Sequence, residues 1–178
     1  MTEIQPISRP TGDGPKWLQV ARGELGVKEI PGQQDNPRIL EYHKTVGLSE
    51  SEATPWCSSF VYWCLKKAGV STAGGTAAAK SWLTASSMQT LEKAVYGCIV
   101  VLNRPPNPAL GHVGFYVGSE GSRILLLGGN QGDKVSISGY PVDRVAGLRW
   151  PRGQLLFSPT TGTDPVSNEV TETSDKTS

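Results

Sequence analysis

The sequence predicts an α+β domain in which N-terminal helices pack on a mostly antiparallel β-sheet of about five strands. Apolar residues recur every three or four positions in the first half of the chain, which is typical of helices with one buried face. From about Tyr96 onward, short β-rich runs follow one another through short turns, which is typical of an antiparallel meander. Helices that precede the strands, rather than alternate with them, indicate an α+β arrangement.

The first half of the chain predicts three helices and a short fourth one. They are expected over residues 15–25, 36–46, 54–68 and 76–83. We expect Asn36 to cap the second helix and Thr54 the third, because their side-chain oxygens accept hydrogen bonds from free amides. Gly69 is expected to end the third helix.

The second half predicts the strands. They are expected over residues 98–102, 112–117, 123–127 and 134–138, with a further run at 147–150. The segment 103–108 contains three prolines, which lack the N–H that a sheet needs, so we expect a rigid loop outside the central ladder. This loop precedes the strand at 112–117 and is a candidate wall of a cleft.

Length and composition indicate one globular domain, because the 178 residues are 37% hydrophobic. We expect a flexible lead-in over 1–14, the domain over 15–157 and a disordered, Thr/Ser-rich tail over 158–178. The net charge of +1 points neither to nucleic acid nor to an anionic membrane as a partner. No apolar run has the length of a membrane span, and we expect a monomer.

Three cysteines, an odd number, give no disulfide framework and are compatible with synthesis in a reducing compartment. The segment 1–6 has neither a basic nor an apolar part, so we expect no secretory signal and synthesis in the cytoplasm.

Cys57 lies in the predicted first turn of the third helix. Free amides and the positive end of the helix dipole favour a thiolate there and predict a lowered pKa for Cys57. A thiolate is the reactive form of a nucleophilic cysteine, whereas the alternative is a small buried core residue. Cys64, two turns farther along, fits that core role.

A cysteine nucleophile needs a base, and the chain has two histidines. His112 is favoured because a strand would hold it rigidly, whereas His43 is expected on a helix face in water or at a rim. Asn130 is the favoured residue to orient the imidazole, with Gln131 and Asp133 as alternatives. No metal and no cofactor are expected, because the Cys and His residues lack paired metal-ligand spacing and the Gly pairs lack a phosphate-loop lysine.

Three sequence boxes together resemble the NlpC/P60 and CHAP superfamily of papain-like cysteine peptidases and amidases. They are Trp-Cys-x-x-Phe-Val at 56–61, Gly-His-Val-Gly-Phe-Tyr-Val-Gly at 111–118 and Gly-Gly-Asn-Gln at 128–131. An upstream Gly-Val-x-Glu element at 26–29, followed by Asn36-Pro37, is similar to a phage- and bacterium-borne branch. Many members carry Gly-Asp-x-Val before the histidine strand, where this chain has Gly-Cys-Ile-Val at 97–100.

The resemblance implies a papain-like fold and cleavage of amide bonds in peptidoglycan. It implies that Cys57 attacks a carbonyl, that His112 transfers the proton and that Asn130 holds the imidazole, in a crevice open to the substrate. The Cys57 backbone N–H would stabilise the oxyanion. The candidate substrate-binding residues are Tyr42, Trp56, Trp82 and Gln131, although packing is the favoured role for Tyr42 and Trp82.

We therefore expect a peptidoglycan endopeptidase or N-acetylmuramoyl-L-alanine amidase, acting as a phage lysin or a secreted antibacterial effector. It would act at the wall or periplasm after delivery by a phage or secretion apparatus, with a cognate immunity protein as a further possible partner. Two alternatives stay open: an inactive wall-binding or structural phage module on the same fold, and a cysteine acyltransferase or deamidase that acts on another amide.

Overall fold

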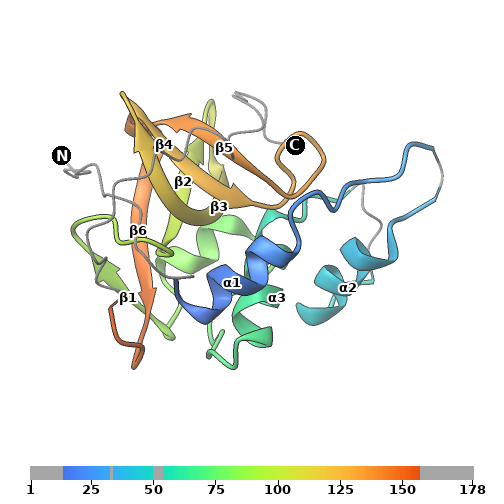
Figure 1. Ribbon diagram of the computed structural model, residues 1–178, viewed down its shortest axis with the longest axis horizontal. Coiled ribbons are helices and arrows are strands. Elements are labelled where there is room, and N and C mark those ends of the chain that lie inside the picture. The colour runs from blue at the N-terminus through green and yellow to red at the C-terminus, as the bar shows by residue number, and fades with distance from the viewer. Residues whose placement is uncertain (1–13, 33, 50–53, 157–178) are drawn as a thin grey trace.

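The computed structural model describes residues 14–32, 34–49 and 54–156, and it has the expected α+β architecture. Figure 1 shows the helices gathered beside the curved sheet, with α1 and α3 next to the strands and α2 on the far side of α3. The expected lead-in at 1–14 and tail at 158–178 lie outside the described residues, except for Gly14. Every helix in the described part of the chain is too short or too polar to cross a membrane.

The sheet has six strands in the order β1-β6-β2-β3-β4-β5, and all neighbouring pairs are antiparallel. The strands are β1 Met88–Leu91, β2 Ile99–Arg104, β3 Asn107–Glu120, β4 Arg123–Gly128, β5 Ser136–Pro141 and β6 Val145–Pro151. The meander is confirmed for β2 to β5. The last strand, β6, returns across the sheet and inserts between β1 and β2, and β1 is a strand that the sequence analysis missed.

The helices are α1 Lys16–Gly23, α2 Pro37–Thr45 and α3 Cys57–Lys67, with short 3-10 helices η1 Ala79–Leu83 and η2 Val142–Arg144. The cap at Asn36 is confirmed, since its side chain accepts from the Arg38 N–H. Gly69 has a φ of 74° and ends α3 as predicted. The predicted cap at Thr54 is wrong, because α3 begins three residues later, after Trp56, and has no side-chain cap.

The predicted loop at 103–108 is shorter in the structure. Arg104 pairs with Asn107, so β2 and β3 form a hairpin and only Pro105 and Pro106 lie between the strands. Pro105 and Pro106 occupy the turn itself, where no ladder hydrogen bond is needed, whereas Pro108 lies within β3. This hairpin brings Asn103 and Arg104 to the end of β2 that is nearest to His112, whose partner on β2 is Leu102.

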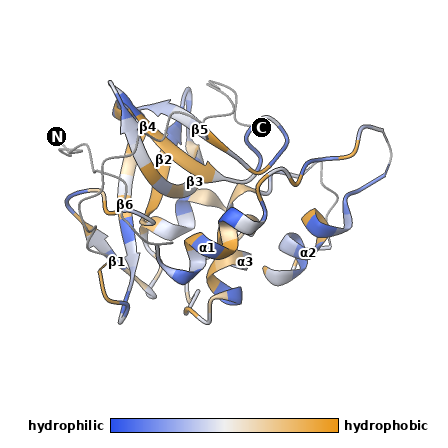
Figure 2. Cartoon of the chain, viewed as in Figure 1, coloured by the Kyte–Doolittle hydropathy of each residue, from blue (hydrophilic) through white to orange (hydrophobic). Residues whose placement is uncertain are grey.

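The core lies between α3 and the inner face of the sheet. Figure 2 shows hydrophobic residues concentrated on α3 and on the central strands, with hydrophilic residues on the outer parts of α1 and α2. Phe60, Val61, Cys64 and Leu65 of α3 are buried, as the helical spacing predicts. Burial of this face fixes the start of α3 against β3 and β4.

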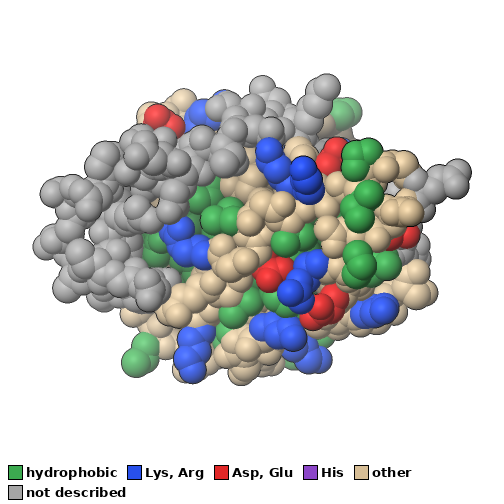
Figure 3. Space-filling view, turned by 45° about the vertical axis from the view of Figure 1, so that its right-hand side comes forward, with side chains coloured by type: hydrophobic (Ala, Val, Ile, Leu, Met, Phe, Trp, Pro, Cys, Tyr) green, Lys and Arg blue, Asp and Glu red, His purple; other side chains and the backbone are tan. Residues whose placement is uncertain are grey.

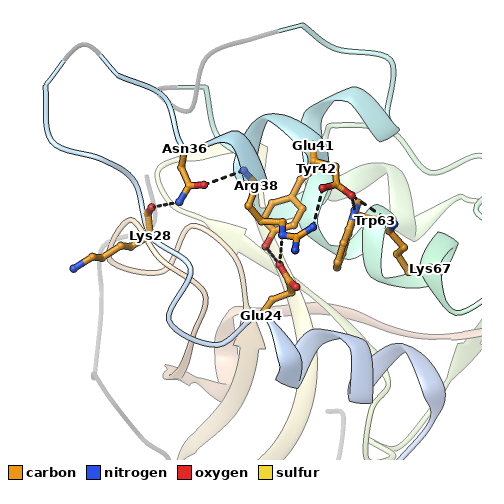
Figure 4. Close-up of polar contacts among 8 residues, drawn as sticks. All are labelled: Glu24, Lys28, Asn36, Arg38, Glu41, Tyr42, Trp63 and Lys67. Atoms are coloured by element: carbon orange, nitrogen blue, oxygen red, sulfur yellow. Dashed lines mark hydrogen bonds and ion pairs between the residues drawn. The ribbon is translucent and has the colours of Figure 1, made fainter.

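Polar side chains tie α1, α2 and α3 together (Figure 4). Glu24 Oε2 accepts a 2.5 Å hydrogen bond from Tyr42 Oη and lies 3.2 Å from Arg38 Nε. Glu41 Oε1 accepts a 2.9 Å hydrogen bond from Trp63 Nε1. Since α3 carries Cys57 at its first residue, this bracing also holds the candidate nucleophile in place.

Candidate active site

Cys57 is the first residue of α3 and is 6% exposed, whereas Cys64 and Cys98 are 0% exposed. The backbone N–H groups of Val113, Ser58 and Cys57 itself lower the pKa of the Cys57 thiol, as a helix start predicts. Burial acts in the opposite direction and is the larger effect, so the pKa of Cys57 is raised overall. The predicted lowering is therefore wrong for this conformation. The contact with Val113 also places the sulfur against the strand that carries His112.

His112 lies on β3 and is 1% exposed. Its Nε2 atom is 2.9 Å from Gln131 Oε1. Burial lowers the pKa of His112 to about 4, the hydrogen bond that His112 donates to Gln131 opposes this shift, and the positive charges of Arg144 and Arg104 add to it. Both pKa directions favour a neutral thiol and a neutral imidazole over a thiolate–imidazolium pair.

The hydrogen bonds of Gln131 determine which His112 nitrogen carries the proton. Gln131 Nε2 donates to two carbonyl oxygens, Ser136 O at 2.7 Å and Leu126 O at 3.2 Å. The amide oxygen of Gln131 therefore faces His112 and can only accept, so His112 Nε2 must be the N–H donor. His112 Nδ1 is then left with the lone pair that a general base needs.

The structure corrects the choice of Asn130 as the residue that holds the imidazole: Gln131 does so. β4 ends at Gly128, so the two amides do not continue the strand. Asn130 instead has a φ of 56°, in the left-handed region that Asn tolerates better than most residues, and the chain reverses there. The reversal returns Gln131 to the buried face of the sheet, where it is 0% exposed.

The two glycines before Asn130 make room for this arrangement. A Cβ atom on Gly128 would lie 2.8 Å from Gln131 Oε1. A Cβ atom on Gly129 would lie 2.6 Å from the Trp56 ring and 2.8 Å from Phe60 Cβ. The Gly-Gly pair therefore lets the β4–β5 turn approach both the imidazole partner and the start of α3.

Tyr140 is a site residue that the sequence analysis missed. Its Oη atom donates to Gln131 Oε1 at 3.2 Å and lies 3.3 Å from His112 Nε2. On the same strand, Ser136 Oγ donates to the Gln131 carbonyl and is 3.2 Å from Ser138 Oγ. A polar residue at every second position of this buried strand was the available signal, because alternate residues share one face.

Three predicted substrate-binding residues are core residues in the structure. Tyr42, Trp56 and Trp82 are each 0% exposed. Trp56 Nε1 donates to Glu29 Oε1 at 2.8 Å, and Trp82 Nε1 donates to Ser58 Oγ at 2.9 Å. Tyr42 packs edge-on against Phe60 and Trp63. These residues support the start of α3 from behind, so packing is the correct interpretation, and the Gln131 side chain likewise contacts His112 instead of lining a surface.

The remaining candidates do not join the site. His43 is 0% exposed, and its Nδ1 atom lies 3.1 Å from Ser59 Oγ between α2 and α3, so its predicted place in water or at a rim is wrong. Asp133 is exposed, and its carbonyl accepts from the Glu29 N–H. Among the residues that the structure describes, no three His, Cys, Asp or Glu side chains are arranged to hold a metal ion.

The site is more closed than the open crevice that was expected. Figure 3 shows basic and acidic side chains interspersed on one face of the molecule, and no histidine is visible on it. This agrees with the burial of both His43 and His112. Of the proposed pair, only Cys57 has more than 1% of its surface exposed, so access to the sulfur is narrow in this conformation.

The family model of the CHAP domain matches residues 49–130, a segment that includes Cys57 and His112 and ends one residue before Gln131. No curated protein matches the chain. Among solved structures, the chain is similar to a Staphylococcus aureus protein described as similar to lipoprotein, NLP/P60 family. The identity is 19%, the TM-score is 0.45, and the match covers 83% of this chain and 44% of the other, so this chain spans less than half the length of that protein.

The CHAP match covers the helix that begins at Cys57 and the strand that carries His112, the two elements on which the candidate site is built. Over residues 49–130 the chain is therefore similar to the CHAP domain family, which agrees with the resemblance at the boxes around Cys57 and His112.

Proposed function

We propose that this protein is a cysteine-dependent peptidoglycan hydrolase that cleaves an amide bond of the stem peptide or its cross-link. It would act as an endopeptidase or as an N-acetylmuramoyl-L-alanine amidase. The observation that carries the proposal is the hydrogen bond between His112 Nε2 and Gln131 Oε1, on a strand whose Val113 N–H lies at the Cys57 sulfur. A core cysteine would not need a buried histidine held in one tautomer on the strand that its sulfur contacts.

In the first step, His112 Nδ1 takes the Cys57 thiol proton as the sulfur attacks the substrate carbonyl carbon. The carbonyl electrons move to the oxygen, and the Cys57 backbone N–H at the start of α3 is a donor for that oxyanion. His112 then returns the proton to the departing amine as the C–N bond breaks, which leaves a thioester on Cys57. Water, deprotonated by His112, attacks the thioester and releases the acid product and the thiol.

The neutral resting pair makes His112 a general base that acts during the attack. Gln131 keeps the proton on Nε2, so Nδ1 is always the accepting nitrogen, and the imidazolium that forms gains a charge-assisted hydrogen bond to Gln131 Oε1. Tyr140 donates to the same oxygen and packs beside the imidazole, with ring centroids 5.2 Å apart. Both residues position His112 without touching the reacting atoms.

The proposal extends to where the protein works. We place its action at the cell wall or periplasm, after delivery by a phage or secretion apparatus, with an immunity protein as a partner if it is a secreted effector. We also propose that residues 15–157 form the catalytic domain, between a lead-in over 1–14 and a tail over 158–178.

The test combines isolated cell walls with purified wild-type protein, Cys57→Ala and the matched control Cys64→Ala. Wild type and Cys64→Ala are expected to lower wall turbidity, while Cys57→Ala is inert, and mass spectrometry of the released muropeptides identifies the bond that is cut. Activity of Cys57→Ala would refute the thiol mechanism. If neither walls nor muropeptides change with wild type, the hydrolase proposal fails; retained wall binding would then favour an inactive binding module.

A further inference from the structure

Two arginines lie beside the site without an acidic partner. Arg104 ends β2 and Arg144 ends η2, and both are half-buried. In the segments 14–32, 34–49 and 54–156, no Asp or Glu side chain forms an ion pair with either guanidinium. Arg144 donates from Nε to the Asn103 carbonyl at 3.0 Å, which uses one of its five N–H donors.

Geometry connects both arginines to the reacting groups. The Arg144 guanidinium carbon lies 5.5 Å from the centre of the Tyr140 ring, and Tyr140 Oη lies 3.3 Å from His112 Nε2. Arg104 is two residues beyond Leu102, the β2 residue that pairs with His112. Both positive charges lower the pKa of His112, and Arg104 also lowers that of Cys57, which agrees with this placement.

A third positive charge belongs to the same group. Lys80 Nζ donates to Asn103 Oδ1 at 2.9 Å, so Asn103 is contacted by Lys80 through its side chain and by Arg144 through its backbone. The net charge of the whole chain is only +1, so three cations around one hairpin end are a local concentration. Two of them, Arg104 and Arg144, have guanidinium nitrogens that no described carboxylate occupies.

We propose that Arg104 and Arg144 bind a free carboxylate of the substrate, close in sequence to the amide that Cys57 attacks. The inference rests on the proposed function and narrows it to acidic peptides, such as stem peptides whose D-glutamyl α-carboxyl group is not amidated. A guanidinium matches a carboxylate with two parallel N–H···O bonds, and such pairs are strong where water is partly excluded. The same carboxylate would set the register of the peptide relative to Cys57.

The test uses two muropeptides that differ only in whether the D-glutamyl α-carboxyl group is free or amidated. We expect wild type to show a KM roughly 10- to 100-fold lower for the free acid, the range of a hydrogen bond to a charged group. Arg104→Gln and Arg144→Gln should reduce that ratio towards one. The control Arg152→Gln alters an exposed arginine on the β6 side that contacts Ser86, and it should keep the wild-type ratio.

Equal KM values for the two muropeptides with wild type would overturn the inference while the hydrolase proposal stands. A fall in kcat for both muropeptides at an unchanged KM ratio would also overturn it, because the arginines would then act on the reacting groups. Direct titration of both muropeptides into Cys57→Ala protein separates the two proposals. Preferential binding of the free acid without any hydrolysis by wild type would keep the carboxylate site and reject the hydrolase, whereas equal binding would reject the carboxylate site.

Discussion

Replacing Gln131 by alanine tests the assignment of the imidazole partner most directly. The matched control is Asn130→Gly, which removes the neighbouring amide side chain but keeps a residue that tolerates a φ of 56°. Gln131→Ala removes the acceptor of His112 Nε2 and Tyr140 Oη and the donor to Ser136 O. All of these groups belong to buried residues.

The magnitude follows from the groups that lose their partner. Each buried donor or acceptor left unsatisfied costs about 1–3 kcal/mol, so two or three of them predict a loss of about 2–9 kcal/mol in the free energy of unfolding. Loss of the fixed tautomer and ring orientation adds a catalytic effect, and we expect kcat to fall roughly 10- to 100-fold, or about 1.4–2.7 kcal/mol. Asn130→Gly should lower kcat by less than about threefold.

The two effects are measured separately. Urea unfolding gives the stability of each variant, and muropeptide hydrolysis at a temperature where both remain folded gives kcat. A folded Gln131→Ala protein with wild-type kcat would refute the role of Gln131, and an equal fall in kcat for Asn130→Gly would return the role to the neighbouring amide.

Three further predictions use the same assays. The pKa of His112 is about 4 in the folded protein against 6.5 for an ordinary histidine. Folding stability is therefore fully present above pH 6.5 and falls by about 3 kcal/mol between pH 6.5 and 4. Urea unfolding of His112→Asn should lack this part of the pH dependence, and an identical pH dependence would contradict the buried neutral imidazole. The rate of Cys57 alkylation should inflect at or above the pKa of an ordinary thiol, about 8.5, because burial raises the pKa of Cys57; a rate plateau extending down to about pH 5 would instead reveal a thiolate–imidazolium pair. Gly128→Ala places a Cβ atom 2.8 Å from Gln131 Oε1 and should lower kcat roughly 10-fold. In the control Gly23→Ala the new Cβ atom meets no atom within 4 Å, so kcat should not fall. Equal kcat values for the two variants would show that Gln131 has room to move.

The helical spacing around Cys57 was enough to predict α3 and its buried face, and the run from 98 to 138 was enough to predict the meander. These are local properties, because one buried face imposes its own period on the sequence. β1 could not be predicted in this way: Met88–Leu91 is a short edge strand that pairs with Pro151 to Leu148, and the paired residues are 57 to 63 positions apart. The residues of a short strand do not by themselves indicate which distant strand they pair with.

At the site, Cys57 and His112 could be selected because few other residues can act as nucleophile and base. The choice between Asn130 and Gln131 depended on where β4 ends, and a shift by one residue exchanges the two faces of a strand. The direction of the net pKa shift of Cys57 could not be predicted either. The helix start, which lowers this pKa, can be read from the sequence, whereas the burial that raises it depends on the whole fold.

The insertion of β6 between β1 and β2 has a consequence for how the protein is made. When the chain has been synthesised only as far as Asp143, it already contains residues 57, 112 and 131. At that stage β1 has no strand to pair with and β2 has one unpaired edge. The sheet that holds the histidine is completed only by its final segment, Val145–Pro151. A growing chain thus contains every proposed reactive residue before it contains the strand that completes the sheet around them.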